Sequence, residues 1–460
     1  MNGIINLGIP HIGEGIFENL SDQDLIKFRH VSTTWKLMAE NVVKKRWQNR
    51  IIEAASSGEN EDVIKILLTH PGAKDINWNE QSDYGKTTFH FACFFGRLDI
   101  VKIMLKKSQT LDINLNMQTK KGFNGLMFAI DNQHIEVVKL LLNHSRIIKI
   151  NARDNKGINA FRWACETGCV DMVKLFLDHS RKIELNAKCN EGFNGFLKAC
   201  FYGHSEIVQL ILNASKAKKI DVGAVSSFGT TGLMWACKNG HVCAVQSILE
   251  YSGSNHNDLN VNAQDFDGST AFIIACSNGH TEVVKLMVNH ATRKNMDLNL
   301  KSKNGITGFM YACGLGHLDI VETLIDNPIV QVDAKDNSGL TGLMAACLGG
   351  KVDVVKLLLD HPRTMNVLYE IQMIIEHMVP SNNTLHVGLN HNEQEIVTLL
   401  KKQEEYLCAK KASKFCDKSG YLIFNPSSSV CAKNQGSDSK FKFLFQNEGL
   451  QFLDLEIFSI

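Results

Sequence analysis

The sequence lacks the motifs that mark the common kinds of catalytic centre. It contains no Gly-x-Ser-x-Gly, no His-Glu-x-x-His and no Gly-x-x-x-x-Gly-Lys-[Ser/Thr], so it predicts no nucleophile elbow, no metalloprotease helix and no phosphate-binding loop. No apolar run approaches the roughly 20 residues that cross a bilayer. The N-terminus has no basic leader before an apolar core, so we expect no signal peptide. Together these absences favour a non-catalytic protein of the cytoplasm, the nucleus or both.

The chain also lacks an excess of positive or negative charge. The chain has 49 Lys and Arg against 48 Asp and Glu, which gives a formal net charge of +1. No global field therefore favours nucleic acid or an anionic membrane as the partner.

The thirteen cysteines include no Cys-x-x-Cys pair, which argues against a zinc or redox site. Seven of them follow an alanine at the same place in a repeated pattern: Cys93, Cys165, Cys200, Cys237, Cys276, Cys313 and Cys347. We expect that place to lie on the buried side of a short helix, where cysteine acts as a small, soft hydrophobe. We therefore predict no metal and no cofactor. Free thiols in this number indicate a reducing compartment.

The chain instead repeats one pattern about eight times. A turn glycine is followed by Ala-Cys, then by Gly-His or a similar pair, and then by a run of Ile, Val and Leu. The turn glycines recur every 34 to 39 residues: Gly85, Gly122, Gly157, Gly192, Gly229, Gly268, Gly305 and Gly339. A fixed period of this size indicates stacked supersecondary units that bury their apolar faces against each other. We therefore expect an elongated binding surface rather than an enzyme with a pocket.

Each unit reads as two helices joined by turns, so the predicted fold class is all-α. The turn glycine stands where a positive φ is expected, and a short helix such as 233–237 follows it. A second helix has apolar residues at i, i+3 and i+4. We expect it to end at an Asn or Asp before a His, as at Asn143-His144 and Asn289-His290, because Asn and Asp tolerate the left-handed conformation. The Gly-His histidines recur with the repeat, which indicates a structural role.

This pattern closely resembles the ankyrin repeat, whose motif runs from Gly and Thr-Pro-Leu-His through Gly-His and Ile-Val to Val-Asn-Ala. The resemblance covers residues 51–402 and implies a solenoid of about eight full and two partial repeats. The motif proline is replaced in every full copy, by Thr88, Gly125, Ala160, Gly195, Gly232, Ala271, Gly308 and Gly342. Because glycine at the start of a helix increases the entropy of the unfolded chain, we expect softer repeats than in a consensus array.

Residues 1–50 differ from the repeats. Ser21 with Asp24 is a helix N-cap signal. The segment resembles an F-box, whose opening Leu-Pro aligns with Ile9-Pro10 and whose Arg-x-Val-Ser-x-x-Trp is intact at 29–35. This resemblance implies a three-helix module that docks on the Skp-type adaptor of a cullin-RING ubiquitin ligase. The adaptor contacts that it implies are Pro10, Ile16, Leu20, Leu25 and Val31, with Trp35 locking the module. The alternative is a helical cap that shields the open face of the first repeat.

The positions that flank the turn glycine, and those that follow Ala-Cys, are exposed in an ankyrin stack and are polar by default. Here they are rich in aromatic and leucine side chains, and aromatic residues are frequent binding hot spots. We predict partner contacts at Tyr84, Phe94, Phe95, Phe201, Tyr202, Phe228, Phe266, Leu315 and Leu348. The alternative, in which rings fold inward and fill grooves, stays open, above all for Phe123 and Phe193, which share a Gly-Phe-Asn-Gly context.

Residues 403–460 change character, from lysine-rich to serine-rich and then to the alternating stretch 441–445. We predict that this tail is mostly disordered, since nothing nearby offers a sheet to a strand there.

The function implied by these resemblances is that of a substrate receptor in an SCF-type ubiquitin ligase, monomeric outside the complex. The F-box would bind the adaptor and cullin, and the repeats would hold an unknown protein substrate, without nucleic acid or membrane. The alternative is an ankyrin scaffold or inhibitor that holds one partner and has no ligase connection. A third reading, a host-manipulating protein, is weaker because the poxviral proteins that resemble this chain carry the F-box last.

Overall fold

The structure is a computed structural model of the 460-residue chain. The described residues are 18–28, 33–47, 50–57, 61–179, 183–251, 259–364, 371–372, 374–375, 391–413, 430–434, 440–445 and 452–456. Two units divide the chain, Met1–Gly349 and Gly350–Ile460.

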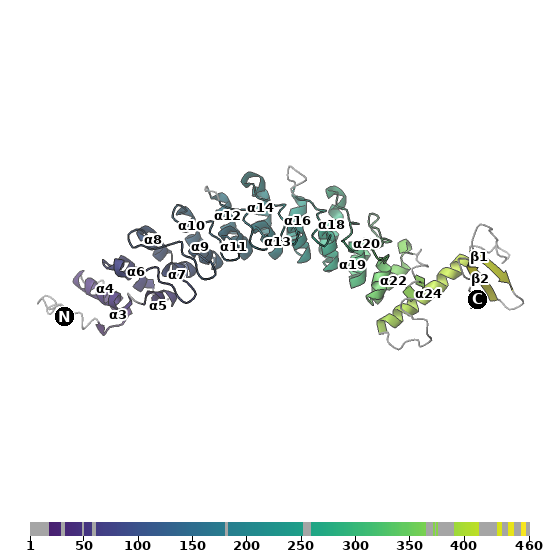
Figure 1. The fold of residues 1–460 in the computed structure, drawn as a ribbon, viewed down its shortest axis with the longest axis horizontal. Helices are drawn as coiled ribbons and strands as arrows, with labels where there is room; N and C mark the ends of the chain where they lie inside the picture. Colours follow the sequence, from purple (N-terminus) through teal and green to yellow (C-terminus); the bar gives the residue numbers. More distant parts are fainter. Residues whose placement is uncertain are drawn as a thin grey trace. The chain divides into compact units, whose positions relative to one another are not determined.

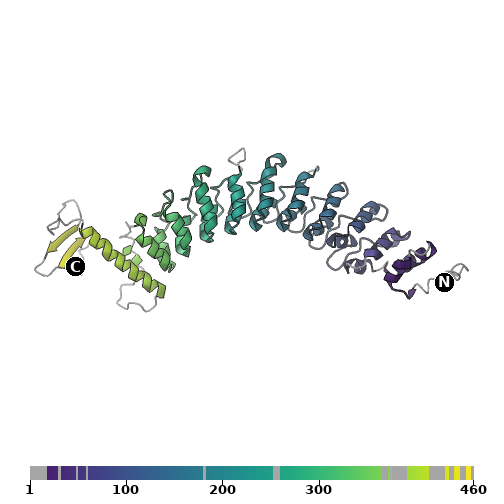
Figure 2. The ribbon, with the colours of Figure 1, turned by 180° about the vertical axis from the view of Figure 1, so that it is seen from behind.

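The repeats of the first unit are helix pairs, as the sequence predicts, and no strand occurs among the described residues of 51–349. The first helix of each pair packs against the first helix of the next pair, so these inner helices form one row, and the second, outer helices form another (Figures 1 and 2). The inner helices are α5 (Ile51–Ser56), α7 (Thr88–Phe94), α9 (Gly125–Asp131), α11 (Ala160–Thr167), α13 (Gly195–Tyr202), α15 (Gly232–Lys238), α17 (Ala271–Ser277), α19 (Gly308–Leu315) and α21 (Gly342–Leu348). The outer helices are α6 (Glu61–Thr69), α8 (Leu98–Lys107), α10 (Ile135–Asn143), α12 (Val170–Asp178), α14 (Ser205–Lys218), α16 (Val242–Glu250), α18 (Thr281–Lys294) and α20 (Leu318–Ile325).

The turn glycines have positive φ, which confirms the prediction: all eight lie between 74° and 84°. Each turn also approaches the next one closely. The backbone N–H of Lys120 donates to the carbonyl oxygen of Tyr84 at 3.2 Å, and that of Asn190 donates to Lys156 at 2.9 Å. A Cβ on Gly85 would stand 2.8 Å from the nitrogen of Lys120. Glycine is therefore required here both by the left-handed conformation and by the neighbouring backbone.

Polar side chains tie each repeat to the next. The Nε2 of His204 lies 3.1 Å from the carbonyl oxygen of Glu166, and the Nε2 of His241 lies 3.0 Å from that of Phe201. These distances confirm the structural role predicted for the Gly-His histidines. On the turn side, a row of asparagines makes the corresponding bonds, with Asn79, Asn116, Asn186, Asn262 and Asn299 each bonded to the backbone of the following repeat.

The seven Ala-Cys cysteines are fully buried between helices, as predicted. Burial disfavours the charged thiolate and raises their pKa, that of Cys347 to about 12. Thiols that stay protonated are poor nucleophiles and poor metal ligands. These positions are therefore core positions.

The predicted ends of the outer helices are only partly correct. α10 and α12 end at Asn143 and Asp178, but α18 continues past Asn289-His290 to Lys294. The left-handed residue that ends α18 is Asn295, with φ 50°. Asn143 itself stays helical and is capped by His144 at φ −96°. In the longer repeats the extra residues therefore lengthen the outer helix. An Asn-His pair alone does not end such a helix.

The second unit contains α22 (Val352–Asp360), the 3₁₀ turn Pro362–Thr364 and α24 (His391–Ser413). Lys356 of α22 and Glu395 of α24 form an ion pair at 2.7 Å. Three strands, β1 (Val430–Asn434), β2 (Lys440–Phe445) and β3 (Phe452–Glu456), form an antiparallel sheet in the order β1-β2-β3. The expectation that nothing nearby offers a sheet to a strand here is wrong, because the alternating stretch 441–445 has a sheet partner on each side, and the chain is not all-α throughout. The disorder of most of 403–460 stays a prediction. The sequence reasoning looked for neighbours of one segment and overlooked the other two.

No helix in the described residues is both long enough and apolar enough to cross a membrane.

Candidate partner-binding surface

Most of the predicted partner residues are exposed. The side chains of Tyr84, Tyr202, Phe228, Phe266, Leu315 and Leu348 are among the large apolar side chains with high exposure, whereas Phe94, Phe95 and Phe201 are half-buried. Tyr84, Phe228 and Phe266 stand beside turn glycines, with exposed fractions of 77%, 59% and 65%. Phe228 and Phe266 lie on neighbouring turns, joined by a hydrogen bond from the N–H of Phe266 to the carbonyl of Phe228 at 3.2 Å. The ring of Phe266 also lies against the turn of Gly229, where a Cβ would stand 2.8 Å from its Cδ1. The exposed faces of these apolar turn tips are available to a partner.

A second set of aromatic residues runs along the inner helices and the turns before them, and four of them, Phe91, Phe128, Trp163 and Trp235, were not predicted from the sequence. We call this set the aromatic stripe. Its members are Phe91, Phe94, Phe95, Phe123, Phe128, Trp163, Phe193, Phe201, Tyr202 and Trp235.

The rings of the stripe contact one another across repeats. Phe94 meets Phe128 with centroids 6.1 Å apart, and Phe123 meets Trp163 at 5.1 Å. Further along, Phe201 meets Trp235 at 5.1 Å. Four of these residues, Phe91, Phe128, Trp163 and Trp235, occupy the fourth position of an inner helix. These four residues could have been predicted, because each stands two residues before the Ala-Cys cysteine of its repeat, or before Ile130 in the repeat that lacks this cysteine.

The alternative of inward-folded rings holds for one of the two open cases. Phe193 is buried and packs with Leu197 and Ala224 in a core cluster against which Trp163, Phe201 and Trp235 rest. Phe123 is half-buried and joins the stripe between Phe128 and Trp163. The stripe therefore contains rings that fill the core, such as Phe193, and rings that stay partly exposed, such as Phe123.

Lysine side chains lie over the rings of the stripe. The Nζ of Lys198 is 4.6 Å from the ring centroid of Phe193, 4.8 Å from Phe201 and 5.5 Å from Tyr202. Lys86 sits in the same way over Phe91, Phe94 and Phe128, and Lys238 lies over Trp235. Cation–π attraction holds such ammonium groups against an aromatic face.

Arg162 brings a further charge to the centre of the stripe. Its side chain is only 3% exposed, and its Nη1 lies 2.9 Å from Glu166 Oε2. The hydroxyl of Tyr202 donates to Glu166 Oε1 at 3.1 Å, and this contact contributes to a raised pKa of Tyr202, after burial. Glu166 is thus already engaged by two groups of the chain itself.

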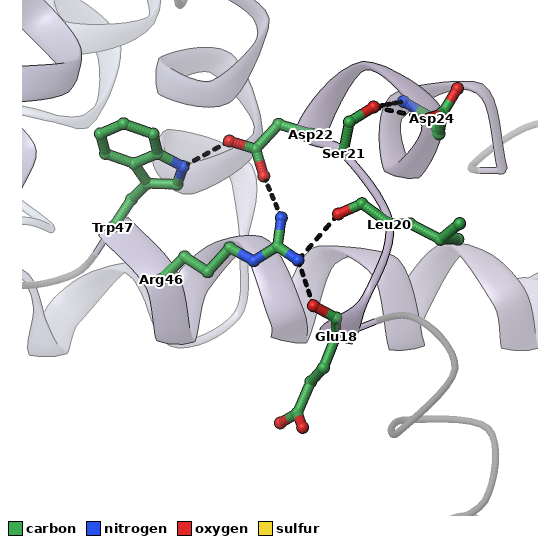
Figure 3. Close-up of polar contacts among 7 residues, drawn as sticks. All are labelled: Glu18, Leu20, Ser21, Asp22, Asp24, Arg46 and Trp47. Carbon is green, nitrogen blue, oxygen red and sulfur yellow. Dashed lines mark hydrogen bonds and ion pairs between the residues drawn. The ribbon is translucent and has the colours of Figure 1, made fainter.

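The N-terminal segment forms a small helical module of α3 (Asp22–Phe28) and α4 (Thr33–Trp47), joined by a polar network (Figure 3). Arg46 donates to the carbonyl oxygens of Glu18 and Leu20 at 2.7 and 2.8 Å and pairs with Asp22 at 2.7 Å. The indole N–H of Trp47 donates to the other oxygen of Asp22 at 2.8 Å. Residues at the end of α4 thereby fix the start of α3.

The N-cap predicted for this module is present, since the N–H of Asp24 donates to Ser21 Oγ at 3.2 Å. The module also packs on the first repeat through α4 and α6. Lys44 pairs with Asp75 at 2.6 Å, and Asn41 lies 3.0 Å from the Nε2 of His70. This packing fits the helical-cap alternative.

The predicted adaptor contacts have different positions. Leu25 is fully buried and Leu20 is half-buried, so Leu25 contributes to the packing of the module itself. Pro10, Ile16 and Val31 lie outside the described residues, as does the side chain of Trp35. The predicted adaptor-binding set therefore remains a prediction.

In the described part of the chain, no three His, Cys, Asp or Glu side chains are placed to hold a metal ion.

Comparison with known proteins agrees with the repeat pattern. A family model described as ankyrin repeats (3 copies) matches residues 27–117, 51–154, 109–189, 126–224, 196–297, 233–336 and 292–370. Among solved structures, the chain is similar to the ankyrin repeat domain of Bcl-3, described as a unique member of the IkappaB protein family. The identity is 26%, the TM-score is 0.44, and the match covers 53% of this chain and 100% of that domain. No curated protein matches this chain.

Proposed function

The chain belongs to the ankyrin-repeat family, and from this premise we propose that it is a non-catalytic receptor that holds a partner protein against the aromatic stripe and the neighbouring turn tips. The observation that carries this proposal is the row of contacting aromatic rings along successive inner helices, continued by exposed Phe228 and Phe266. Aromatic side chains on a preformed surface lose little conformational freedom on binding and are frequent hot spots. Four such anchors at about 2 kcal/mol each would support micromolar binding before the cost of association.

We further propose that the N-terminal segment recruits the Skp-type adaptor of an SCF-type ubiquitin ligase, so that the bound partner becomes a substrate. The intact Arg-x-Val-Ser-x-x-Trp at 29–35 supports this proposal, and so does the presence of two packed helices around it. The chain itself would contribute only proximity, by raising the local concentration of substrate lysines near the conjugating enzyme. Such a receptor acts in the cytoplasm or the nucleus.

The alternative is an ankyrin scaffold in which residues 18–47 only cap the first repeat. The ion pair and hydrogen bonds between α4 and the first repeat favour it. The two roles are compatible, because a helical module can pack on the array with one face and bind an adaptor with another. Leu37 of α4 is half-exposed and apolar, so this module retains an apolar surface outside its contacts with the chain.

The receptor role is tested by replacing rings of the stripe in the full-length protein. We expect the double variant Phe201→Ser/Trp235→Ser to lose at least one partner that the wild type captures from a cell lysate. The matched control is Tyr406→Ser, an exposed ring in the second unit, which should capture the same proteins as the wild type. Identical capture by all three proteins would rule out the stripe as the partner surface.

The ligase role is tested separately with purified adaptor and cullin. Wild type should bind both, a Leu20→Asp/Val31→Asp variant should bind neither, and Lys27→Asp, an exposed change on α3, should bind as the wild type does. If the wild type fails to bind, residues 18–47 are a cap and the protein is a scaffold.

A further inference from the structure

We propose that the partner presents an acidic linear segment, and that its carboxylates bind at one place on the aromatic stripe, around Lys198. We call this place the lysine centre and define it by Arg162, Lys198, Lys238 and the rings of Phe193, Phe201, Tyr202 and Trp235. The inference rests on the proposed receptor function and adds to it the chemistry of the bound segment.

The first observation is a lysine that packs among aromatic rings and has no counter-charge in the described residues. The side chain of Lys198 is 9% exposed and lies over three rings, between 4.6 and 5.5 Å from their centroids. Within the described part of the chain, no carboxylate pairs with it. Partial burial disfavours a charged ammonium group, and cation–π contacts offset only part of that penalty. An incoming carboxylate would therefore gain more here than at a fully solvated lysine.

The second observation is that nearly all the unsatisfied polar groups of the stripe are donors. The indole N–H groups of Trp163 and Trp235 are buried and have no acceptor, and neither does the Nε of Arg162. The one carboxylate nearby, Glu166, is held by Arg162 and by the hydroxyl of Tyr202. Glu166 Oε2 is itself buried and accepts no hydrogen bond, so unsatisfied donors outnumber unsatisfied acceptors in this centre. A ligand that completes it must bring oxygen atoms, preferably charged ones.

The geometry favours an extended peptide over a nucleic acid. Rings of the centre meet edge to face, Phe193 with Phe201 at 87° and Phe201 with Tyr202 at 74°, and Lys198 covers their faces. Bases stack on open ring faces, and these faces are covered. Phosphates also require a track of cations, whereas the formal net charge of the chain is +1.

A second lysine over rings suggests the length of the segment. Lys86 lies over Phe91, Phe94 and Phe128, three repeats before Lys198. With helices packed about 8–10 Å apart, three repeats span about 24–30 Å, which an extended chain covers in about seven to nine residues. A segment with two acidic residues at that spacing could contact both lysines.

The experiment uses a phage-displayed library of random 12-residue peptides selected on the full-length protein. Peptides selected by the wild type should be enriched in Asp and Glu. A synthetic copy of a selected peptide should bind Lys198→Met at least about tenfold more weakly, and its affinity for the wild type should fall with salt. Methionine keeps the apolar stem over the rings, so the variant should fold. Lys216→Met, which removes an exposed lysine from outer helix α14, should bind as the wild type does.

The outcomes separate this inference from the proposed function. Selected peptides without acidic enrichment, or equal binding by Lys198→Met, would overturn the acidic-segment inference while the stripe could still be the partner surface. Selection of the same peptides by Phe201→Ser/Trp235→Ser would overturn both. A labelled single-stranded oligonucleotide that binds the wild type and loses affinity with Lys198→Met would show nucleic acid as the ligand and would also overturn the inference.

Discussion

The ring of Phe196 lies against the backbone of Gly232 in the next repeat, so closely that a Cβ on Gly232 would stand 2.7 Å from Cε1 of the ring. Phe196 is the second residue of α13, and Gly232 is the first residue of α15. The same pairing joins Phe89 to Gly125, Phe161 to Gly195, Phe272 to Gly308 and Phe309 to Gly342. Where the first position is alanine, at Ala160 and Ala271, the preceding repeat has leucine, Leu126 and Leu233. A phenylalanine is thus followed by glycine, and a leucine by alanine.

This pairing predicts a compensating pair of substitutions. Gly232→Ala should lower the free energy of unfolding by about 1–3 kcal/mol, because the buried ring of Phe196 cannot move away from the new methyl group. Phe196→Leu should restore much of that loss in the double variant, although alone it leaves a cavity. Denaturant unfolding of the four proteins gives the coupling between the sites.

The control for that cycle is Ala271→Gly, which faces Leu233 rather than a phenylalanine. It should cost only the lower helix propensity of glycine, about 0.5–1 kcal/mol. Additive effects of Gly232→Ala and Phe196→Leu would contradict the proposed fit between repeats.

The pairing also gives a packing reason for glycine at the position of the motif proline. Softer repeats, expected from the glycines in place of the motif proline, stay a prediction. In the structure each such glycine makes room for a ring of the preceding repeat. The repeat number, the turn glycines and the buried cysteines could be predicted because each is a property of one repeat. The fit between Phe196 and Gly232 could not, because it depends on which side chains meet across an interface.

Gln133 shows the same dependence on the following repeat. It adopts φ 58°, where the other repeats of the first unit have glycine, such as Gly96 and Gly240. A Cβ on those glycines would collide with a histidine of the next repeat, His134 or His280. After Gln133 the corresponding residue is Cys169, so a side chain fits at the cost of a left-handed backbone.

We therefore predict that Gln133→Gly combined with Cys169→His raises the stability of the array by about 1–2 kcal/mol. The glycine removes the backbone strain, and the histidine can make the bond that His134 makes to the carbonyl of Phe94. Cys169→His alone should destabilise the array, since it meets the Gln133 side chain. Thermal unfolding of the three variants tests this order, and a stable Cys169→His single variant would contradict it.

Replacing one asparagine of the row on the turn side should weaken the contact between two neighbouring repeats. The side-chain amide of Asn186 donates to the carbonyl of Lys219 at 2.8 Å and accepts from the N–H of Asp221 at 2.8 Å. Asn186→Ala removes both bonds and should cost about 1–2 kcal/mol. Asn186→Asp keeps the acceptor and should cost less. Hydrogen exchange at the N–H of Asp221 is the direct readout, and unchanged protection in Asn186→Ala would show that these surface bonds add nothing.

We predict that the stability of the first full repeat decreases in acid because of His90. It is the fully buried N3 residue of α7, its Nδ1 accepts from the N–H of Thr87 at 3.0 Å, and its Nε2 lies 2.9 Å from the carbonyl oxygen of Met117. Burial lowers the pKa of His90 from 6.5 to about 4, and nearby Lys86 adds to this effect. The folded chain therefore keeps His90 neutral at pH values where the unfolded chain protonates it.

The sign of the pH effect follows from this difference. Between pH 6.5 and about 4 the unfolded state binds one more proton at this site, so stability falls as the pH falls, by about 3 kcal/mol over the whole interval. His90→Met places at this position the residue found at Met127, Met234, Met310 and Met344 and should remove this part of the pH dependence. The measurement is hydrogen exchange in α7 of both proteins at pH 7 and pH 5, corrected for the intrinsic exchange rate. An equal loss of protection in both would mean that other groups, not His90, set the acid response.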